Sequence, residues 1–149
     1  MTRIKVHKPI LRARSSFFRE AFAANETEVR LVERTSIVKI ALEYLYSGWT
    51  DADIFPIALE LMAFATKLDL TCLGNKCFRQ LRDSLSASNA VDVIILAHSK
   101  MSYYDHIYLH CMAVIKGNAH RLSANDFDKL QQEPVLLRKL LIDCCMKLW

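Results

Sequence analysis

The chain has 149 residues, is 52% hydrophobic and carries a formal net charge of +4, with only 3 glycines and 3 prolines. This length and hydrophobicity suffice to bury a core and exclude a disordered tail. So few helix-breaking residues indicate helices joined by short loops. No apolar run approaches the roughly 18 to 20 residues of a membrane span, and basic residues interrupt the start of the chain, which argues against a signal peptide.

The first third of the chain predicts two short strands and two helices. Polar and apolar residues alternate over 2–7, which is the period of a half-buried strand, and a second short strand is expected over 28–33. Helices are expected over about 8–14 and about 16–23. Pro9 suits the first turn of the earlier helix, because the missing N–H would have no partner there.

Three longer helices are expected next. Thr35 is a plausible N-cap for a helix that ends at Gly48, where a left-handed cap costs little. A largely uncharged helix is expected over about 54–68, with Pro56 in its first turn, and another begins at Thr71. The low charge of the middle helix predicts that it is central and buried.

A serine-rich stretch over 84–88 predicts a boundary between a domain over 1–85 and a helical region over 86–149. The second region is expected to contain four helices: from Ser88-Asn89 to about Lys100, from Tyr103 to Lys116, from Ala124 to Gln132 after a Ser123 cap, and from Pro134 onward. Two short strands cannot hold a core alone, so the helices must provide most of it. The expected fold class is therefore mainly α (α+β), with a small residual β-sheet and helical hairpins after it.

Three strings of residues occur in order along the chain: His-Lys-Pro-Ile-Leu-Arg-Ala-Arg-Ser-Ser-Phe-Phe from His7, Ala-Leu-Glu-Tyr-Leu-Tyr-Ser-Gly from Ala41, and Ser-Asn-Ala-Val from Ser88. The first two resemble the H-K-x-x-L-x-A-R-S-x-x-F and Y-L-Y-T-G motifs of BTB/POZ domains. The third resembles the start of the BACK (3-box) extension in speckle-type POZ, Rho-related BTB and kelch-type proteins. The residues that carry the resemblance are His7, Lys8, Leu11, Arg14, Ser15, Phe18, Tyr44, Tyr46, Gly48 and Asn89.

This resemblance implies protein binding without catalysis. Such proteins are typically substrate adaptors that hold the N-terminal domain of cullin-3, and they raise the effective concentration of substrate near the ubiquitin carrier. The chain departs from the family pattern: it lacks the usual first helix and first strand, and it contains no recognition module. The family's hydrophobic-x-Glu motif has only the weak counterpart Ala24-Asn25-Glu26. By resemblance, the partner-facing residues are expected to be Phe22, Ala24, Glu26, Tyr44, Tyr46, Trp49, Tyr103 and Tyr104.

Two other functions remain open from the sequence. One is a BTB-type self-association or scaffold module, a possible homodimer, in a transcriptional or cytoskeletal complex without ubiquitin transfer. The other is a basic nucleic-acid binder, since six basic residues precede the first acid: Arg3, Lys5, Lys8, Arg12, Arg14 and Arg19. No aromatic stacking pattern accompanies these residues, so nucleic-acid binding is the weaker interpretation.

No catalytic, cofactor-binding or metal-ligating residue is expected. The sequence contains no G-x-S-x-G, no H-E-x-x-H and no glycine-rich phosphate loop. His106 and His110 have a spacing that suits zinc, but without a third ligand at a fixed spacing they are better explained as partly exposed helix residues. Five cysteines without a secretion signal predict reduced thiols, in the cytoplasm or the nucleus.

Overall fold

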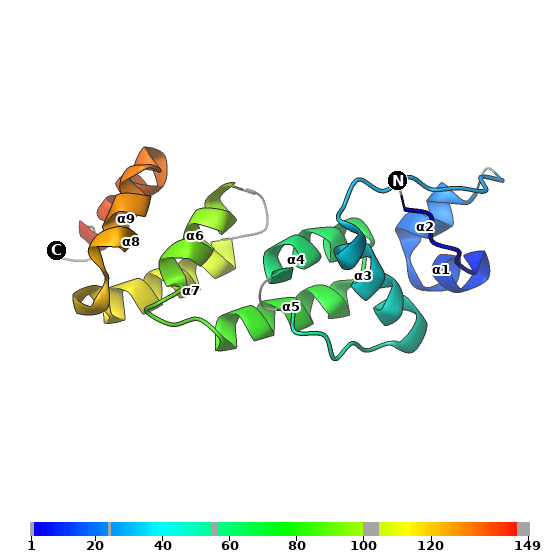
Figure 1. The fold of residues 1–149 in the computed structure, drawn as a ribbon, viewed down its shortest axis with the longest axis horizontal. Helices are drawn as coiled ribbons and strands as arrows, with labels where there is room; N and C mark the ends of the chain where they lie inside the picture. Colours follow the sequence, from blue (N-terminus) through cyan, green and yellow to red (C-terminus); the bar gives the residue numbers. More distant parts are fainter. Residues whose placement is uncertain (1, 24, 55–56, 100–104, 146–149) are drawn as a thin grey trace. The chain divides into compact units, whose positions relative to one another are not determined.

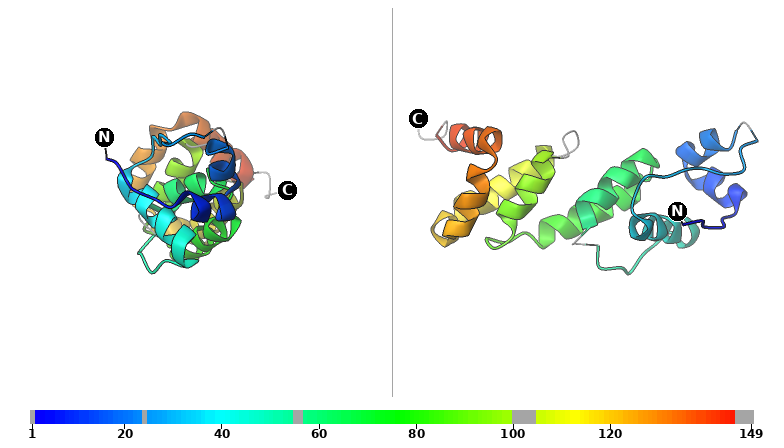
Figure 2. Two further views of the ribbon diagram at one scale, coloured as in Figure 1. Left: turned by 90° about the vertical axis from the view of Figure 1, so that its right-hand side faces the viewer. Right: turned by 45° about the horizontal axis from the view of Figure 1, so that its top comes forward.

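The computed structural model describes residues 2–23, 25–54, 57–99 and 105–145. Across these residues the protein contains α-helices α1 to α9, one short 3-10 helix and no β-strand, which confirms the mainly α fold class. The chain divides into two compact units, Met1–Leu81 and Arg82–Trp149. The first unit is blue to green and the second green to red in Figures 1 and 2. The division falls in the last turns of α5, slightly before the serine-rich stretch.

The first unit is a cluster of short helices around one apolar core. Its helices are α1 (Lys8–Arg14), α2 (Ser16–Ala21), α3 (Thr35–Ser47), α4 (Ala58–Lys67) and α5 (Thr71–Asp83). Helix α1 packs on α2 and α3, and α3 packs on α4 (Figure 1). The core includes Leu11, Phe18, Ile37, Leu45, Leu61, Phe64, Leu73 and Cys77. Helix α4 is largely buried, as its low charge predicts.

A single buried serine separates α1 from α2. Ser15 has an extended backbone (φ −142°, ψ 124°), which ends α1 and makes it the N-cap of α2. Its hydroxyl accepts a hydrogen bond from the amide of Phe18 (3.4 Å) and donates one to the carbonyl of Leu68 (2.6 Å). Because Leu68 follows α4, this one hydroxyl joins the α1–α2 pair to the end of α4.

The two ends of α3 differ in how well the sequence predicted them. The N-cap is Arg34, one residue before the expected Thr35, and it makes no side-chain cap; its guanidinium instead pairs with Glu60 of α4 (2.7 Å). At the other end Gly48 has φ +80°, and its amide donates a hydrogen bond to the carbonyl of Tyr44 (2.8 Å), which confirms the predicted left-handed cap. Pro56 lies outside the described residues.

The prediction of two strands is wrong. Residues 2–7 and 28–33 are irregular, and no backbone hydrogen bond among the described residues joins one segment to the other. The alternation of side chains is nevertheless present, because Val6, Val29 and Leu31 pack against the core. The sequence pattern therefore predicted which side chains face inward, whereas a strand also needs a neighbouring backbone to pair with.

The second unit consists of two helical pairs. Helices α6 (Ala90–Ser99) and α7 (Asp105–Gly117) pack on each other, η2 (Ala119–Arg121) follows, and α8 (Ala124–Gln131) packs on α6 and on α9 (Pro134–Cys145). Ser123 begins α8 with a reciprocal capping box that involves Asp126, as its position predicted. Asn89 directly precedes α6. Its side chain accepts a hydrogen bond from the amide of Ser86 and donates one to the carbonyl of Ser84.

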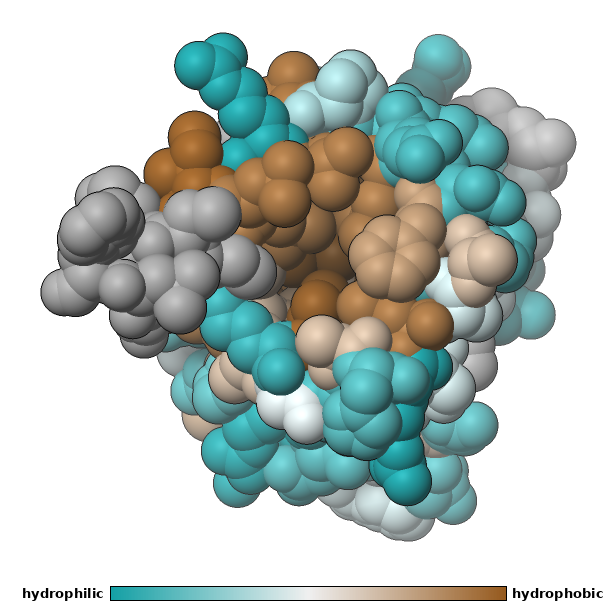
Figure 3. Space-filling model, turned by 90° about the vertical axis from the view of Figure 1, so that its left-hand side faces the viewer, coloured by the Kyte–Doolittle hydropathy of each residue, from teal (hydrophilic) through white to brown (hydrophobic). Residues whose placement is uncertain are grey.

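Several large apolar side chains of the second unit are exposed. On α8 and α9 they are Phe127, Val135, Leu141 and Ile142. Figure 3 shows apolar side chains gathered around a hollow, with hydrophilic side chains at its rim. Within the described part of the chain, no helix is long and apolar enough to cross a membrane.

Two glycine substitutions should have opposite effects on stability. Gly48→Ala places a Cβ at φ +80°, which we expect to destabilise the fold by about 1–2 kcal/mol. Gly74 lies within α5, and an added Cβ there would meet no atom within 4 Å, so Gly74→Ala should stabilise by about 0.5–1 kcal/mol. Urea denaturation of both variants measures the difference; two changes of the same sign would contradict this account.

The described cysteines should differ sharply in reactivity. Burial raises the pKa of the Cys77 and Cys111 thiols to about 12, whereas Cys72 is exposed. Because the thiolate is the reactive form, iodoacetamide at pH 8 should label Cys72 first and the two buried thiols only after unfolding. Peptide mapping by mass spectrometry, with and without urea, checks the order, and equal labelling in the native protein would refute it.

Candidate protein-interaction surface

Two exposed aromatic side chains stand at the end of α3. Tyr46, in the last turn of α3, is 40% exposed, and Trp49, two residues after the helix, is 58% exposed. Ser47 fixes the backbone between them: its hydroxyl lies 2.6 Å from the carbonyl of Trp49 and accepts a hydrogen bond from the amide of Trp49 (3.2 Å). Beyond Trp49, the buried Thr50 accepts a hydrogen bond at its carbonyl from Lys76 of α5. We name Tyr46 and Trp49 the aromatic pair.

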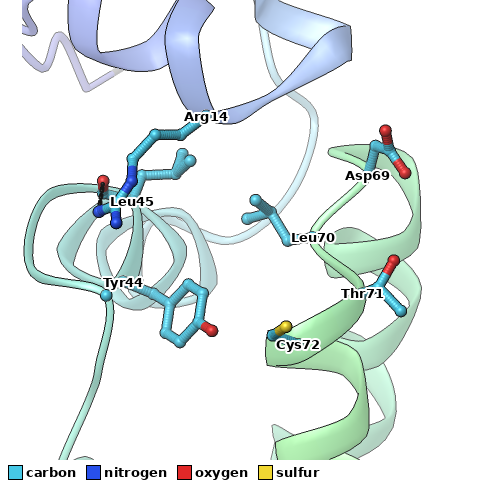
Figure 4. Close-up of a pocket in the computed structure, with 8 residues that line it drawn as sticks. Arg14, Tyr44, Leu45, Asp69, Leu70, Thr71 and Cys72 are labelled. Carbon is cyan, nitrogen blue, oxygen red and sulfur yellow. Dashed lines mark hydrogen bonds between the residues drawn. The ribbon is translucent and has the colours of Figure 1, made fainter.

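Arg14 closes the end of α3. Its guanidinium Nη1 donates a hydrogen bond to the carbonyl of Leu45 (2.8 Å) and lies 3.5 Å from that of Tyr46. These carbonyls belong to the last turn of α3, which has no intrahelical donors for them and carries a partial negative charge. The Arg14 cap therefore satisfies and neutralises the helix end from which the aromatic pair projects; Figure 4 shows the guanidinium against this end.

His7 holds Tyr46 from the other side. The backbone amide of His7 donates a hydrogen bond to the Tyr46 hydroxyl (2.7 Å), and its ring Nδ1 lies 3.0 Å from the same oxygen. The two rings meet edge to face with centroids 5.9 Å apart. The residue before α1 therefore helps to set the direction of a partly exposed side chain in the last turn of α3.

A hollow of about 370 Å³ adjoins the Arg14 cap. Its lining comes from α1, the end of α3, the turn between α4 and α5 and the start of α5: Arg14, Tyr44, Leu45, Gly48, Asp69, Leu70, Thr71 and Cys72. Figure 4 shows the Tyr44 ring beside it. Burial raises the pKa of Tyr44, and the nearby Cys72 adds to the rise while Arg14 opposes it. A phenol is protonated at neutral pH, and the raised pKa does not change this, so the Tyr44 hydroxyl can donate a hydrogen bond.

The other expected partner-facing residues are placed differently. Phe22 is buried at 7% exposure, and its ring stacks on Phe18 with centroids 5.9 Å apart. Lys8 lies over the same ring, 5.3 Å from its centroid, and donates a hydrogen bond to the carbonyl of Glu26 (2.6 Å). Glu26 itself is exposed. The positions of Ala24, Tyr103 and Tyr104 lie outside the described residues.

Sequence reasoning missed the contribution of the turn between α4 and α5. Asp69 has φ +58°, accepts a hydrogen bond from the hydroxyl of Ser16 (2.9 Å), and lines the hollow together with Cys72. An aspartate between two helical patterns is a usable signal, because Asp tolerates the left-handed region better than most residues. No group of three metal-binding side chains occurs among the described residues.

Comparisons with known proteins agree with this architecture. The BTB/POZ domain family model matches residues 1–85. The chain is 26% identical over 148 residues to BTB and MATH domain-containing protein 40 of Caenorhabditis elegans, which covers 92% of this chain and 36% of that protein. It is 32% identical over 101 residues to a BTB/POZ domain-containing protein of Arabidopsis thaliana, which covers 63% of this chain and 48% of that protein.

The chain therefore belongs to the BTB/POZ family, whose domains mediate protein–protein interactions. It spans between about a third and a half of the length of these two relatives. Several residues of the motifs have structural roles in this chain. Leu11 and Phe18 fill the core, while Arg14 and Gly48 shape the end of α3.

Two arginines of α1 provide a matched test of the Arg14 cap. Arg14→Ala leaves the carbonyl of Leu45 without its charged donor, and we expect a loss of about 1–2 kcal/mol in the free energy of unfolding. The side chain of Arg12 is exposed, so Arg12→Ala should change stability by less than about 0.5 kcal/mol. Chemical denaturation compares the two variants, and similar values would show that the cap contributes little.

Proposed function

We propose that the protein is a non-enzymatic adaptor component of a cullin-3 ubiquitin ligase, working in the cytoplasm or the nucleus. The observation that carries the proposal is the exposed aromatic pair on a helix end whose backbone is already fixed. Tyrosine and tryptophan dominate the energetics of protein interfaces, because they bury much area at a small cost in side-chain entropy. In this proposal, the aromatic pair contacts the N-terminal domain of cullin-3.

Preorganisation supports this choice of surface. Binding costs free energy whenever it must order a loop or a side chain. Here the Arg14 cap, the Ser47 hydroxyl and the His7 contact hold the segment before a partner arrives. The adjoining hollow, with its Tyr44 hydroxyl, offers space for a partner side chain next to the aromatic pair.

The loop after α2 has a supporting part in this proposal. Alanine is a weak anchor for an apolar pocket, so Trp49 replaces the hydrophobic position of the family motif as the main anchor. Glu26 lies two residues after Ala24 and is exposed, and its backbone carbonyl accepts a hydrogen bond from Lys8. We further propose that residues 86–149 form a BACK-like extension and that α6 and α7 also bind cullin-3. Such an adaptor acts by proximity and needs no catalytic residue.

Calorimetric titration with the N-terminal domain of cullin-3 tests the proposal. We expect micromolar or tighter binding and a loss of about tenfold or more for Trp49→Ala, as for an interface hot spot. Phe127→Ala is the matched control, because Phe127 is a similarly exposed aromatic (50%) on α8 of the second unit, which the proposal does not assign to the contact. Equal losses for both variants would place the contact elsewhere.

Light scattering on the same samples tests the alternative of a self-associating scaffold. A folded protein that gives no heat with cullin-3 but has the mass of a dimer would overturn the adaptor proposal in favour of that alternative. If cullin-3 binds, Glu26→Lys should weaken binding, since Glu26 is the exposed acid of the α2 loop. An unchanged affinity would exclude the loop from the contact.

A further inference from the structure

Ser16 joins the start of α2 to the turn between α4 and α5. Its half-buried side chain donates a hydrogen bond from the hydroxyl to the Asp69 carboxylate, with 2.9 Å between the two oxygens. Asp69 has a left-handed backbone (φ +58°) and lines the hollow beside the Arg14 cap; Figure 4 shows its side chain at the turn before α5. Such a backbone costs free energy for a residue that carries a side chain, so the turn depends on the contacts that hold it. The Ser16 hydroxyl is one of these contacts.

Two arginines near Ser16 make no ion pair among the described residues: Arg12 and Arg19. Arg19 lies one turn after Ser16 on α2, and its Nε donates a hydrogen bond to the backbone carbonyl of Arg12 (3.3 Å). The Arg19 side chain therefore runs back toward the end of α1, where α2 begins. Both arginines are exposed, and so is Glu20, the acid nearest to them in sequence, whose charge water and salt screen. Two positive charges thus lie unpaired beside a surface hydroxyl.

We propose that Ser16 is a phosphorylation site for a serine kinase that selects arginine before its substrate serine, and that the phosphate leaves Asp69 for the two arginines. Arg12 and Arg14 stand four and two residues before Ser16, a charge pattern that an acidic kinase cleft recognises. In the reaction, the Ser16 hydroxyl oxygen bonds to the γ-phosphorus of ATP, the bond from that phosphorus to the leaving ADP oxygen breaks, and the hydroxyl proton passes to the catalytic base of the kinase. This site does not depend on the adaptor proposal.

The charge of the phosphate produces the change of partner. A phosphoserine carries a charge of about −1.5 to −2 near pH 7 and has no hydroxyl hydrogen left to donate. The Asp69 carboxylate would then face a second anion at hydrogen-bond distance, which repels it. Guanidinium groups, in contrast, bind phosphate through parallel charge-assisted hydrogen bonds. Phosphorylation therefore moves Ser16 from the turn to the arginines, and the turn between α4 and α5 loses one of the contacts that hold it.

Burial selects Ser16 over the serine beside it. Ser15 is 2% exposed, and its hydroxyl donates a hydrogen bond to the carbonyl of Leu68 (2.6 Å), so its modification would require the α1–α2 pair to leave the core. Ser16 needs a smaller opening, because its hydroxyl lies at the surface and the backbone before it is already extended. Helices α1 and α2 have seven and six residues, and helices this short are not stable alone. A local opening at their junction gives a kinase access to Ser16.

Phosphorylation of the full chain tests the site. The probes are protein kinase A and protein kinase C, both of which select basic residues before the serine, each with ATP. We expect mass spectrometry to find phosphate on Ser16 ahead of every other serine, and Ser16→Ala to lose most of the incorporated phosphate. Phosphate on Ser15 instead, equal labelling of other serines, or no phosphate on Ser16 with either kinase would overturn the proposal.

Amide hydrogen exchange of the phosphorylated chain tests the change of partner. The amides of residues 68–70 are hydrogen-bonded to α4, and we expect their exchange to become about fivefold faster after phosphorylation. Asp69→Asn is the matched variant, because asparagine also tolerates a left-handed backbone but carries no charge. In that variant, phosphorylation should leave the exchange nearly unchanged. Equal acceleration in both proteins, or none in either, would overturn the change of partner.

A phosphatase assay tests the part of the arginines. Alkaline phosphatase should remove the phosphate about fivefold faster from Arg19→Gln than from the protein with Arg19, because a guanidinium no longer holds it. Arg79→Gln, an exposed change on α5, is the control and should leave the rate unchanged. Equal rates in all three proteins would overturn capture of the phosphate by Arg19.

Discussion

The arrangement of α1 and α3 in the first unit depends on the hydrogen bond from the Arg14 guanidinium to the carbonyl of Leu45. It joins the last turn of α1 to the last turn of α3, two helix ends far apart in the sequence. A helix C-terminus presents unpaired carbonyls, and a charged donor satisfies them better than a neutral one. Gly48 complements the cap, because its left-handed backbone turns the chain away while leaving room for the guanidinium.

The α1–α2 pair is hydrogen-bonded to the ends of two longer helices, α3 and α4. Ser15 ties it to the end of α4, Arg14 ties it to the end of α3, and His7 directs Tyr46 outward. These three residues belong to one short motif, so a few consecutive positions organise contacts with segments that follow much later in the chain. The motif residues thus hold the end of α3 and the aromatic pair, which we propose as the interaction surface.

The sequence predicted the ends of several helices correctly, but its prediction of paired strands was wrong. Pro9, Gly48 and Ser123 marked helix ends correctly, because their effects depend only on nearby backbone. The strand over 28–33 was wrong, since a ladder requires a second backbone that no local pattern reveals. The N-cap at Thr35 was wrong by one residue, since Arg34 pairs with Glu60 of a distant helix.

The candidate site shows the same division. Tyr46 and Trp49 are exposed, and their contact with a partner stays a prediction. Phe22, which was expected to face a partner, is buried by stacking against Phe18, with Lys8 above its ring. The hollow beside Arg14 could not be foreseen, because its lining comes from segments that are far apart in the sequence. Side-chain roles that depend on a tertiary contact were therefore the ones that sequence reasoning could not assign.

The central claim is that the Arg14 cap holds the end of α3 and thereby the aromatic pair. Amide hydrogen exchange of residues 45–50 tests it most directly, in the unmodified protein and in the Arg14→Ala and Arg12→Ala variants under identical conditions. This account predicts clearly faster exchange at Gly48 and Trp49 in the Arg14 variant alone. Equal exchange rates in all three proteins would contradict it and would show that the end of α3 is fixed by its own helix and the core.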